Sequence, residues 1–455
     1  MSRWWIGFLA VLLACSAILT QRGTNPSLLD DSDTVGILKG IEERQSPVSW
    51  FGTDWPLENH FYRPISTLTF ESDRFLHDSN AAGFGLTNAL LACLCVIGTY
   101  LAALSLTRRT GAAVFAALWF LLANLDVPQR LSWLFWLVPL GLATCLLPKR
   151  RFGPALVASL IAWFAATEFH REPDLYYRMI GWIPGRTAST MTVFALLAIA
   201  LHAYAVWVSS RPSPLPETST DVPATKSSVQ AELRPSAAWW LQSRSLVCLL
   251  LALGSYEQAV TVPFIMLLTW GWFRMQRYRP TLWPVLASYG LLVCYVALRM
   301  VILGTEVSRY QDQQFRASSS VFWSWTEYAL PGLFGFWANL RAWVGFEGLL
   351  LPGFWIAFLG LVATVVTLVI ACKRFRSCPA AQITLYGWLA SSIAFAPMAF
   401  LKHFDHYHYL PMALRSLTVV GALWMFAKIW VSAASLPSVQ APRRLHPAPG
   451  SLPRP

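Results

Sequence analysis

The sequence predicts an all-α polytopic membrane protein with about twelve transmembrane helices and long external loops, and three observations point to this fold class. Of the 455 residues, 55% are hydrophobic and only 13% are charged, whereas a soluble domain carries about 25% charged residues. Apolar runs of membrane-crossing length recur along the chain, with short basic clusters between them, as expected for a polytopic protein. The 23 tryptophans fit this class, because aromatic side chains gather at both membrane interfaces.

The formal net charge of +12 does not indicate nucleic-acid binding. The basic residues lie in short clusters between apolar runs, where the positive-inside rule expects them on the cytoplasmic side of a membrane. The eight cysteines lie in or beside apolar segments, without CxxC or paired-loop spacing. We therefore interpret them as small apolar side chains, and not as disulfides or metal ligands.

The N-terminal half, residues 1–208, contains six predicted spans. The first apolar run, 4–20, is either a cleaved signal peptide or a first transmembrane helix, and the many spans that follow favour the helix. A long polar loop, 21–85, separates it from the second span. The remaining spans of this half lie at 86–107, at 111–125, before the basic cluster at 149–151, at 154–167 and at 187–208.

A stretch rich in Pro, Ser and Thr at 209–236 has no apolar period, which predicts a disordered cytoplasmic linker, 209–243, before the C-terminal half, 244–432. The apolar run at 245–273 exceeds the roughly 20 residues of one span and has Glu257 in its middle. We interpret it as a hairpin of two short spans that turns near Glu257, because a single helix would put the next basic cluster on the wrong side. The later spans lie at 283–303, before the cluster at 373–376, at 380–401 and up to 431, and a Pro-rich tail, 433–455, is predicted to be a disordered cytoplasmic segment.

Twelve spans place both termini in the cytoplasm and the protein in the inner (cytoplasmic) membrane of the cell. All basic clusters then lie on the cytoplasmic side, and the acidic first loop, the Glu257 turn and a His-rich turn lie outside. The clusters are Arg108-Arg109, Lys149 to Arg151, Arg274 to Arg279, Lys373 to Arg376, and Arg443-Arg444.

The loop at 28–64 is the main candidate for a functional site. It begins with the acidic pair Asp30-Asp31, a few residues after the first span, and ends with Tyr62-Arg63-Pro64. Carboxylates held just outside a bilayer suit a reaction at its surface, where a lipid-borne substrate presents its head group. The alternative is a solvated polar loop that Arg63 anchors.

The order of these elements resembles that of GT-C glycosyltransferases, polytopic enzymes that use polyprenyl-phosphate sugars. The resemblance is closest to the branch of the protein O-mannosyltransferases and the tetratricopeptide-containing transmembrane mannosyltransferases. Members of this branch show an acidic pair after the first span, a Tyr-Arg-Pro element, and a second span that begins with Asn and His residues. The matching elements here are Asp30-Asp31, Tyr62-Arg63-Pro64, Asn88, Trp182-Ile183-Pro184-Gly185-Arg186, Glu257 in SYEQAVTVP, and Asp405-His406-Tyr407-His408-Tyr409-Leu410-Pro411.

The chain departs from the family pattern in three places. Tyr256 stands where the family often has Lys, and His406 stands where it usually has Arg. After the third span the family tends to have His-Pro and a glutamate, and this chain has Asn124, Asp126 and Gln129 instead. These departures leave an active enzyme and a divergent, inactive member as alternatives.

The resemblance implies an enzyme that moves a sugar from a polyprenyl-phosphate lipid to a protein, lipid or polysaccharide acceptor on the outer face of the membrane. Attack on the anomeric carbon needs a base that takes the proton of the acceptor hydroxyl. Asp30 or Asp31 is the candidate, and Asp30 is preferred because the first acid of the family's pair usually has the catalytic place. The departing lipid phosphate needs cationic hydrogen-bond donors. The candidates for phosphate contacts are Arg63, Arg186 and His406, and those for supporting or second acidic residues are Tyr62, Asp126, Glu257 and Asp405.

No cofactor is predicted. His403, His406 and His408 have a spacing at which a metal can bind, but apart from Asp405 no acidic or Cys residue next to them supports a divalent metal.

A transporter or flippase is the second functional hypothesis. It would have ionisable residues near mid-membrane and paired half-symmetry, whereas these spans are nearly free of charge and the halves do not repeat. A non-catalytic membrane scaffold is the third, and it does not explain why acidic loops recur on one face.

Overall fold

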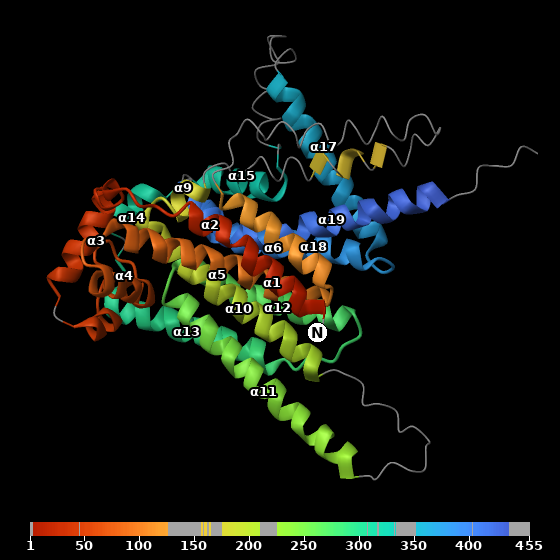
Figure 1. The fold of residues 1–455 in the computed structure, drawn as a ribbon, viewed down its shortest axis with the longest axis horizontal. Helices are drawn as coiled ribbons and strands as arrows, with labels where there is room; N and C mark the ends of the chain where they lie inside the picture. Colours follow the sequence, from red (N-terminus) through yellow and green to blue (C-terminus); the bar gives the residue numbers. More distant parts are fainter. Residues whose placement is uncertain are drawn as a thin grey trace, which may run out of the picture.

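The computed structural model describes residues 3–125, 156–164, 175–209, 225–331, 333 and 352–435, apart from residues 45, 158, 162, 307, 316, 317 and 403. Most helices in these ranges run along the long axis of the molecule (Figure 1). The described residues contain no strand, and only a single antiparallel bridge joins Phe315 to Leu401. The predicted all-α class is therefore confirmed for this part of the chain.

The N-terminal part consists of a short helical head and a set of longer apolar helices. The first apolar run forms α1 (Arg3–Ala14) and α2 (Ser16–Thr20). The polar loop after it contains η1 (Pro26–Leu29), α3 (Ser32–Glu42), η2 (Pro47–Gly52) and α4 (Pro64–His77). The elements that follow are α5 (Ala81–Thr107), α6 (Thr110–Ala123), α9 (Leu175–Met179), η5 (Ile183–Gly185) and α10 (Arg186–Ser209).

The C-terminal part begins with a long helix, α11 (Thr225–Leu253). Residues 225–236 of the predicted linker belong to this helix. Residues 210–224 lie outside the described residues, so the linker as a whole stays a prediction. Extending a helix costs far less than starting one, so the apolar span that follows carries the helix back into this polar segment. The later elements are η6 (Glu257–Thr261), α12 (Val262–Met275), α13 (Trp283–Leu303), α14 (Arg309–Gln314), α15 (Ser318–Ala329), α17 (Pro352–Arg374), α18 (Pro379–Phe395), η9 (Ala396–Phe400), η10 (Asp405–His408) and α19 (Tyr409–Ser435).

Several of these helices identify the chain as a membrane protein. Seven described segments are long and apolar enough to cross a membrane: Ala81–Thr107, Ile183–Ser209, Ser236–Leu253, Trp283–Leu303, Ala357–Arg374, Pro379–Phe400 and Asp405–Ile429. Two further apolar segments, Trp4–Thr20 and Thr110–Ala123, are shorter. The predicted fourth span and half of the fifth lie outside the described residues, so a total of twelve stays a prediction.

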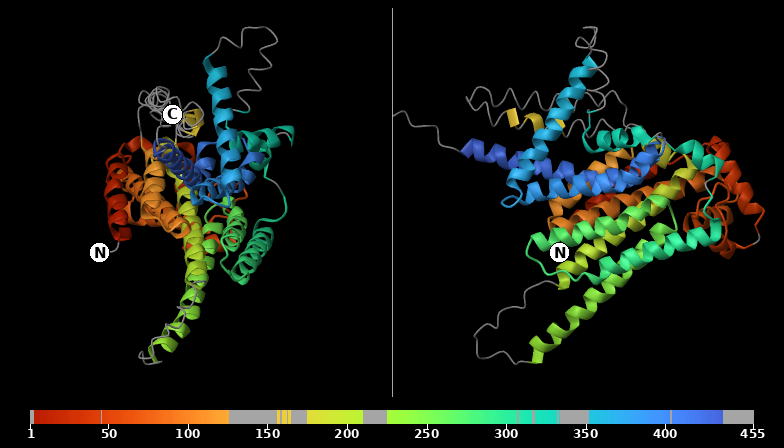
Figure 2. Two further views of the ribbon diagram at one scale, coloured as in Figure 1. Left: turned by 90° about the vertical axis from the view of Figure 1, so that its right-hand side faces the viewer. Right: turned by 180° about the vertical axis from the view of Figure 1, so that it is seen from behind.

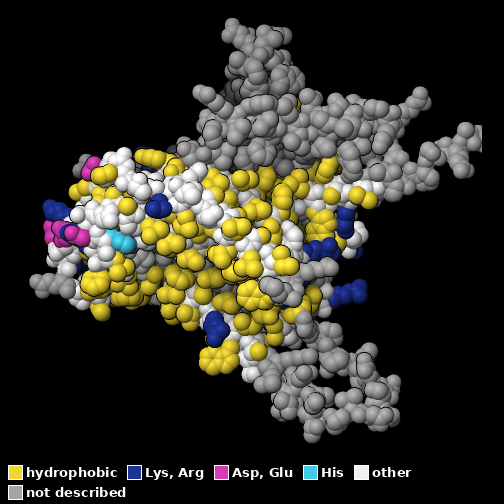
Figure 3. All heavy atoms as spheres, viewed as in Figure 1, with side chains coloured by type: hydrophobic (Ala, Val, Ile, Leu, Met, Phe, Trp, Pro, Cys, Tyr) yellow, Lys and Arg dark blue, Asp and Glu magenta, His cyan; other side chains and the backbone are white. Residues whose placement is uncertain are grey.

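On the face shown in Figure 3, the Asp and Glu side chains gather at one end of the bundle, which we call the acidic end, whereas Lys and Arg side chains occur at both ends. The helix ends that carry Arg108, Arg109 and Arg274 lie at the opposite end, which we call the basic end. At the basic end, Arg108 follows α5 and its guanidinium lies 3.2 Å from the centre of the Trp207 ring of α10. The Gln276 amide, just after α12, donates to Gln382 near the start of α18. Between the two ends, hydrophobic side chains cover the surface in Figure 3.

The predicted turn near Glu257 is found, because it joins α11 to α12. Membrane crossing by α12 stays a prediction, since this helix is not among the apolar segments named above. The turn between α11 and η6 lies at the acidic end, where the backbone N–H of Ile65 at the start of α4 donates to the Gly254 carbonyl at 2.9 Å. The chain then returns along the bundle through α12 (Figure 2), whose last turn contains Arg274 and which ends where Gln276 contacts Gln382. The turn is therefore held against the first loop, and this contact brings Glu257 to the site.

Two glycines allow α18 and α19 to pack closely. A Cβ added to Gly387 would lie 2.5 Å from the Thr418 backbone nitrogen, and one added to Gly421 would lie 2.5 Å from the Thr384 backbone nitrogen. Small residues at such crossings let helix backbones approach in a membrane. This contact holds the turn between the two helices, which carries His406, against the bundle.

Candidate functional site

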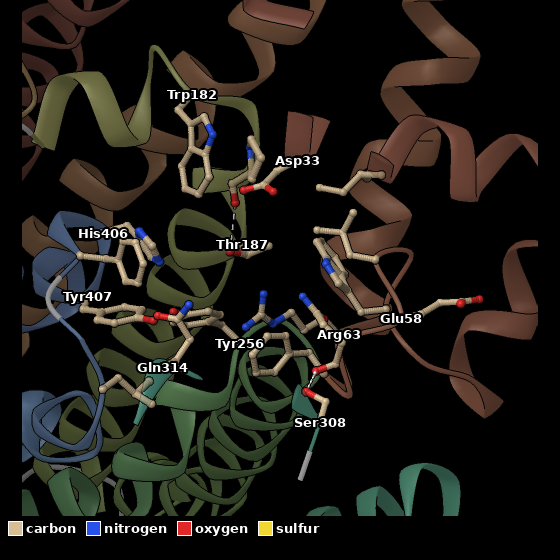
Figure 4. Close-up of a pocket in the computed structure, with 18 of the residues that line it drawn as sticks. Asp33, Glu58, Arg63, Trp182, Thr187, Tyr256, Ser308, Gln314, His406 and Tyr407 are labelled. Carbon is tan, nitrogen blue, oxygen red and sulfur yellow. Dashed lines mark hydrogen bonds between the residues drawn. The ribbon is translucent and has the colours of Figure 1, made fainter. Parts of the chain in front are cut away.

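A cavity of about 660 Å³ opens at the acidic end of the bundle (Figure 4). Its wall is formed by segments that are far apart in the sequence: α3 with the loop before α4, the segment around η5, the α11–η6 turn, the region of α13 and α14, and the turn between α18 and α19. Most of the motifs singled out in the sequence therefore meet at one place. We call this space the head cavity.

Asp33 is the carboxylate that points into the head cavity in Figure 4. It lies in the first turn of α3, and Asp31 is the N-cap of this helix, because its Oδ1 accepts from the Asp33 backbone N–H at 3.2 Å. Glu58 also lines the wall, but its carboxylate points away from the centre (Figure 4). Partial burial, and next the charge of Asp31, raise the pKa of Asp33, while Arg178 opposes this shift. A raised pKa suits a general base.

The predicted acidic pair does not line the cavity. Asp31 joins two segments instead, since its Oδ2 accepts from Trp182 Nε1 at 2.8 Å. The Trp182 carbonyl in turn accepts from Asn88 Nδ2 at 3.2 Å. Asp30 follows η1 and is exposed to solvent. The structure therefore assigns Asp31 the position of a helix cap, and Asp30 lies on the surface.

Arg63, in the wall of the cavity, forms an ion pair with Glu257, which does not itself line this space. Arg63 Nε donates to both Glu257 oxygens, at 3.1 and 3.0 Å, and Nη2 donates to Oε2 at 2.7 Å. The guanidinium also lies 4.1 Å from the centre of the Phe61 ring and 4.6 Å from that of Tyr256. Because both of its oxygens accept from Arg63, Glu257 is a counter-ion here. The two residues that the sequence singled out are thus brought together, 194 positions apart.

The loop before α4 is held in an uncommon backbone conformation. Glu58 and His60 have φ values of 50° and 63°, in the left-handed region that residues other than glycine seldom adopt. Asp54 stabilises the loop, because its carboxylate accepts from the backbone N–H groups of His60 and Phe61 at 2.8 and 3.0 Å. Arg299 Nη2 of α13 donates to the His60 carbonyl at 3.1 Å. Strained backbone of this kind is concentrated at functional sites.

Further cationic side chains line the head cavity. Arg178 Nε lies 3.8 Å from Asp405 Oδ2, and its guanidinium lies 5.3 Å from the centre of the Trp182 ring. Arg299 faces the cavity from α13. His406 is almost completely buried beside Trp182, with a distance of 5.4 Å between the ring centres. The space in front of Asp33 is therefore lined by groups that suit an anion.

Arg186 lies inside the bundle and does not line the head cavity, so the predicted phosphate contact is not supported by its position. Its side chain is fully buried and its Nη2 lies 2.7 Å from Asp73 Oδ2. Its Nε donates to Asn88 Oδ1 at 3.0 Å, and its other nitrogens donate to the Thr69 and Phe84 carbonyls. We call this ion pair the Arg186–Asp73 brace, because it joins α4, α5 and the start of α10.

The remaining predicted residues have other surroundings. The Tyr62 hydroxyl donates to the Phe51 carbonyl at 3.0 Å, and burial raises its pKa. Asp126 lies outside the described residues, as do Gln129 and His403. Among the residues that the structure describes, no three His, Cys, Asp or Glu side chains form a group that could hold a metal ion.

A second cavity of about 1070 Å³ adjoins the head cavity. It lies along α12 and α13, and α15 and η9 close its other side; we call it the apolar groove. Arg299, Phe315 and Leu401 line both spaces. The other residues of the groove are Glu257, Val260, Thr261, Phe264, Leu267, Leu268, Tyr295, Val296, Trp325, Ile393, Ala396, Pro397, Met398 and Phe400. Its wall is thus mainly hydrophobic, with charged groups only where it meets the head cavity.

Sequence reasoning missed three residues of the site: Asp33, Arg178 and Arg299. Arg299 carried a readable signal, because it lies inside an apolar span, and an ionisable residue there is a functional candidate by default. For Asp33 the signal was Asp31, a residue type that often begins a helix. A helix that begins there places Asp33 in its first turn, and not in an irregular loop. Arg178 had no signal beyond its place in a polar loop.

No protein-family model, no curated protein and no solved structure matches this chain. The grounds for assigning a function are therefore the geometry of the two cavities and the order of motifs in the sequence.

Proposed function

We propose that the protein is a membrane glycosyltransferase that moves a sugar from a polyprenyl-phosphate lipid to a hydroxyl group of a cell-envelope acceptor. The observation that supports this most strongly is the junction between the head cavity and the apolar groove. A polar space with a carboxylate and several cationic groups opens into a long hydrophobic one. A sugar phosphate on a polyprenyl chain has the same division into a polar head and an apolar tail, whereas a nucleotide sugar needs no such groove.

The reaction assigns roles to three groups around the head cavity. The Asp33 carboxylate takes the proton of the acceptor hydroxyl as its oxygen attacks the anomeric carbon of the sugar. The bond between this carbon and the phosphate oxygen breaks, and polyprenyl phosphate leaves with the electron pair. Arg299, which lines both spaces, stabilises the charge that develops on the phosphate, and His406 assists from the opposite wall. Arg63 stays paired with Glu257 and fixes the shape of the wall.

The proposed site faces the outside of the cell. The helix ends that carry Arg108, Arg109 and Arg274 lie at the end of the bundle opposite to the head cavity, and basic residues next to spans favour the cytoplasmic side. Nucleotide sugars are not present outside the cytoplasmic membrane, so a lipid-linked donor is required there. The substrate class and the location of the site thus agree.

A transfer assay tests the proposal. The full-length protein in phospholipid nanodiscs is incubated with a cell-envelope fraction and a polyprenyl-phosphate sugar that carries a radiolabel on the sugar. We expect label to move to the envelope fraction, and no movement when a labelled nucleotide sugar is the donor. Transfer from the nucleotide sugar alone would contradict the lipid-linked donor. If the label stays on every lipid-linked sugar tested with every envelope fraction, the enzymatic proposal is wrong.

A further inference from the structure

A third cavity lies at the basic end of the bundle, between the first turns of α6 and the second half of α19. Its volume is about 430 Å³, and we call it the α6–α19 pocket. It is far from the head cavity along these helices, because at their other ends the Tyr409 hydroxyl donates to Asn124 Oδ1. The residues that line it are Arg109, Gly111, Ala112, Phe115, Val420, Leu423 and Trp424.

Two positive charges share one aromatic ring at this pocket: Arg109 and Trp424 line it, and Lys428 lies beside the Trp424 ring. The Arg109 guanidinium lies 4.2 Å from the centre of the Trp424 ring, and Lys428 Nζ lies 5.3 Å from it. Both side chains are exposed to solvent. In the described part of the chain, no carboxylate forms an ion pair with Arg109 or Lys428. An external anion at this position would therefore be attracted by both groups without competition from a neighbouring acid.

The helix geometry at the mouth also favours an anion. Arg109 is the N-cap residue of α6, and its side chain does not cap the helix. The first N–H groups of a helix carry a partial positive charge, which adds to the attraction of the two cations. The cations, the helix end and the tryptophan ring act on the same small volume.

The inner part of the pocket is apolar. Phe115, Val420 and Leu423 form its walls, and a Cβ added to Gly111 would have no neighbouring atom within 4 Å. A free phosphate ion would leave these walls in contact with water or with nothing. An amphiphile fills the whole space, with its charged head at Arg109 and its chains against the apolar residues.

We propose that the α6–α19 pocket binds an anionic phospholipid of the membrane leaflet at the basic end. Tryptophan at this depth fits the interfacial belt of membrane proteins, and Lys428 can extend its charged end to the head-group level. Pockets with basic residues between transmembrane helices are a recurrent type of anionic-lipid site. Bound lipid would join α6 to α19 at this end, as the Asn124–Tyr409 hydrogen bond joins them at the other. The inference is independent of the proposed glycosyl transfer.

Native mass spectrometry of the full-length protein tests this site. The protein is exchanged into detergent with phosphatidylglycerol or with phosphatidylethanolamine of the same acyl chains, and the lipid molecules that remain bound are counted. We expect one phosphatidylglycerol to be retained that phosphatidylethanolamine does not replace. Arg109→Gln with Lys428→Gln should weaken its binding about 30-fold, which corresponds to about 1 kcal/mol for each basic residue near an anionic lipid surface.

Two matched variants separate the pocket from general attraction by a basic surface. Arg274→Gln with Arg376→Gln removes the same charge from the same end, but neither residue lines the pocket, so lipid retention should stay at the parental level. Gly111→Leu keeps every charge and fills the cavity, so it should reduce retention while the melting temperature stays at or above the parental value. The Leu variant also covers the case in which the charge variants fail to fold.

Three results would overturn the proposal. The first is equal retention of the two phospholipids by the parent protein. The second is equal loss in the Arg109/Lys428 and Arg274/Arg376 variants, which would mean diffuse attraction to the basic end. The third is displacement of the lipid by millimolar inorganic phosphate alone, which would make the site a free-anion site.

Discussion

Two pairs of arginine and carboxylate lie at the acidic end of the bundle, and they have the same chemistry and the same distance but different surroundings. In both, an Arg Nη2 lies 2.7 Å from a carboxylate oxygen. The side chains of Arg63 and Glu257 are 11% and 24% exposed, whereas those of Arg186 and Asp73 are 0% and 3% exposed. In the first pair, Arg63 lines the head cavity and Glu257 lines the apolar groove, whereas the second pair is enclosed by helices.

The difference in burial gives the two pairs different physical roles. A buried charge without its partner is expensive, so breaking the brace leaves a large penalty behind. The Arg63–Glu257 pair is partly reached by water, which screens the charges and reduces the cost of breaking it. The brace therefore holds the site in place, and the residues around the head cavity are the ones that can contact a substrate. The chemical type and the distance of an ion pair do not separate these roles; its surroundings do.

The largest expected effect is on the rate of sugar transfer when Asp33, the proposed general base, is replaced. Asp33→Asn keeps the shape of the side chain but removes the proton acceptor, so the rate of sugar transfer should fall about 100-fold to 10,000-fold. Asp33 is not involved in the brace, and its replacement should change the free energy of unfolding by less than about 0.5 kcal/mol. The transfer assay and thermal unfolding in detergent check the two parts.

Asp30→Asn is the matched control for this experiment. Asp30 is on the surface and does not line the head cavity, so the variant should turn over at the parental rate. The opposite pattern, with loss in Asp30→Asn and none in Asp33→Asn, would restore the assignment that the sequence favours. It would also show that the wall described by this structure is not the catalytic one.

The next effect is on stability. Arg186→Met leaves Asp73 without its partner in the interior, and the free energy of unfolding should fall by about 3–5 kcal/mol. Asp73→Asn in the same chain removes the unpaired charge, so the double variant should recover part of this loss. Chemical unfolding of the purified protein in detergent measures both. If Arg186→Met unfolds like the parent but binds a lipid-linked donor more weakly, Arg186 is a phosphate contact, as the sequence predicts.

A smaller effect on stability is expected for the Arg63–Glu257 pair. A double-mutant cycle with Arg63→Gln and Glu257→Gln should give a coupling free energy well below that of the brace, within the range of about 0.5–3 kcal/mol for residues in contact. Arg63→Lys should lose less transfer activity than Arg63→Gln, because the charge survives while the planar fork is lost. A coupling as large as that of the brace would mean that both pairs are structural.

The fold could be predicted well where composition and charge decide it. The all-α class and the turn near Glu257 follow from apolar run lengths and from the position of basic residues, and both are found in the described residues. The disordered linker stays a prediction, and its described part continues the helix of the next span, because helix propagation can extend a stable span into a polar segment. Here the neighbouring element, and not the local sequence, determines residues 225–236.

The site could be predicted in its parts but not in its geometry. The sequence singled out Arg63, Glu257 and His406. Arg63 and His406 line the head cavity, and Glu257 is paired with Arg63 and lines the adjoining apolar groove. The sequence could not show that Arg186 is buried. The residues that enclose its side chain belong to α4 and α5, which precede it in the chain by about a hundred residues. Nor could the sequence choose among acids a few residues apart, since the start of α3 directs Asp31 and Asp33 to different neighbours.

The smallest effect is a shift in the pH dependence of transfer, and it tests whether Asp33 responds to its surroundings as the structure implies. Asp33 works as a base only when it is ionised, so kcat/KM should fall as the pH drops through its pKa, which lies above the ordinary value of 3.8. Asp31→Asn removes a negative charge that raises this pKa, so the acidic limb of the profile should move to lower pH. Asn caps helices as well as Asp does, so α3 should begin at the same residue. Arg178→Gln removes a positive charge that lowers the pKa, so the limb should move to higher pH. Asp30→Asn removes a carboxylate that is not among the charges acting on Asp33, so it should leave the profile in place. If the Asp31→Asn and Arg178→Gln profiles shift in the same direction, Asp33 is not the titrating base.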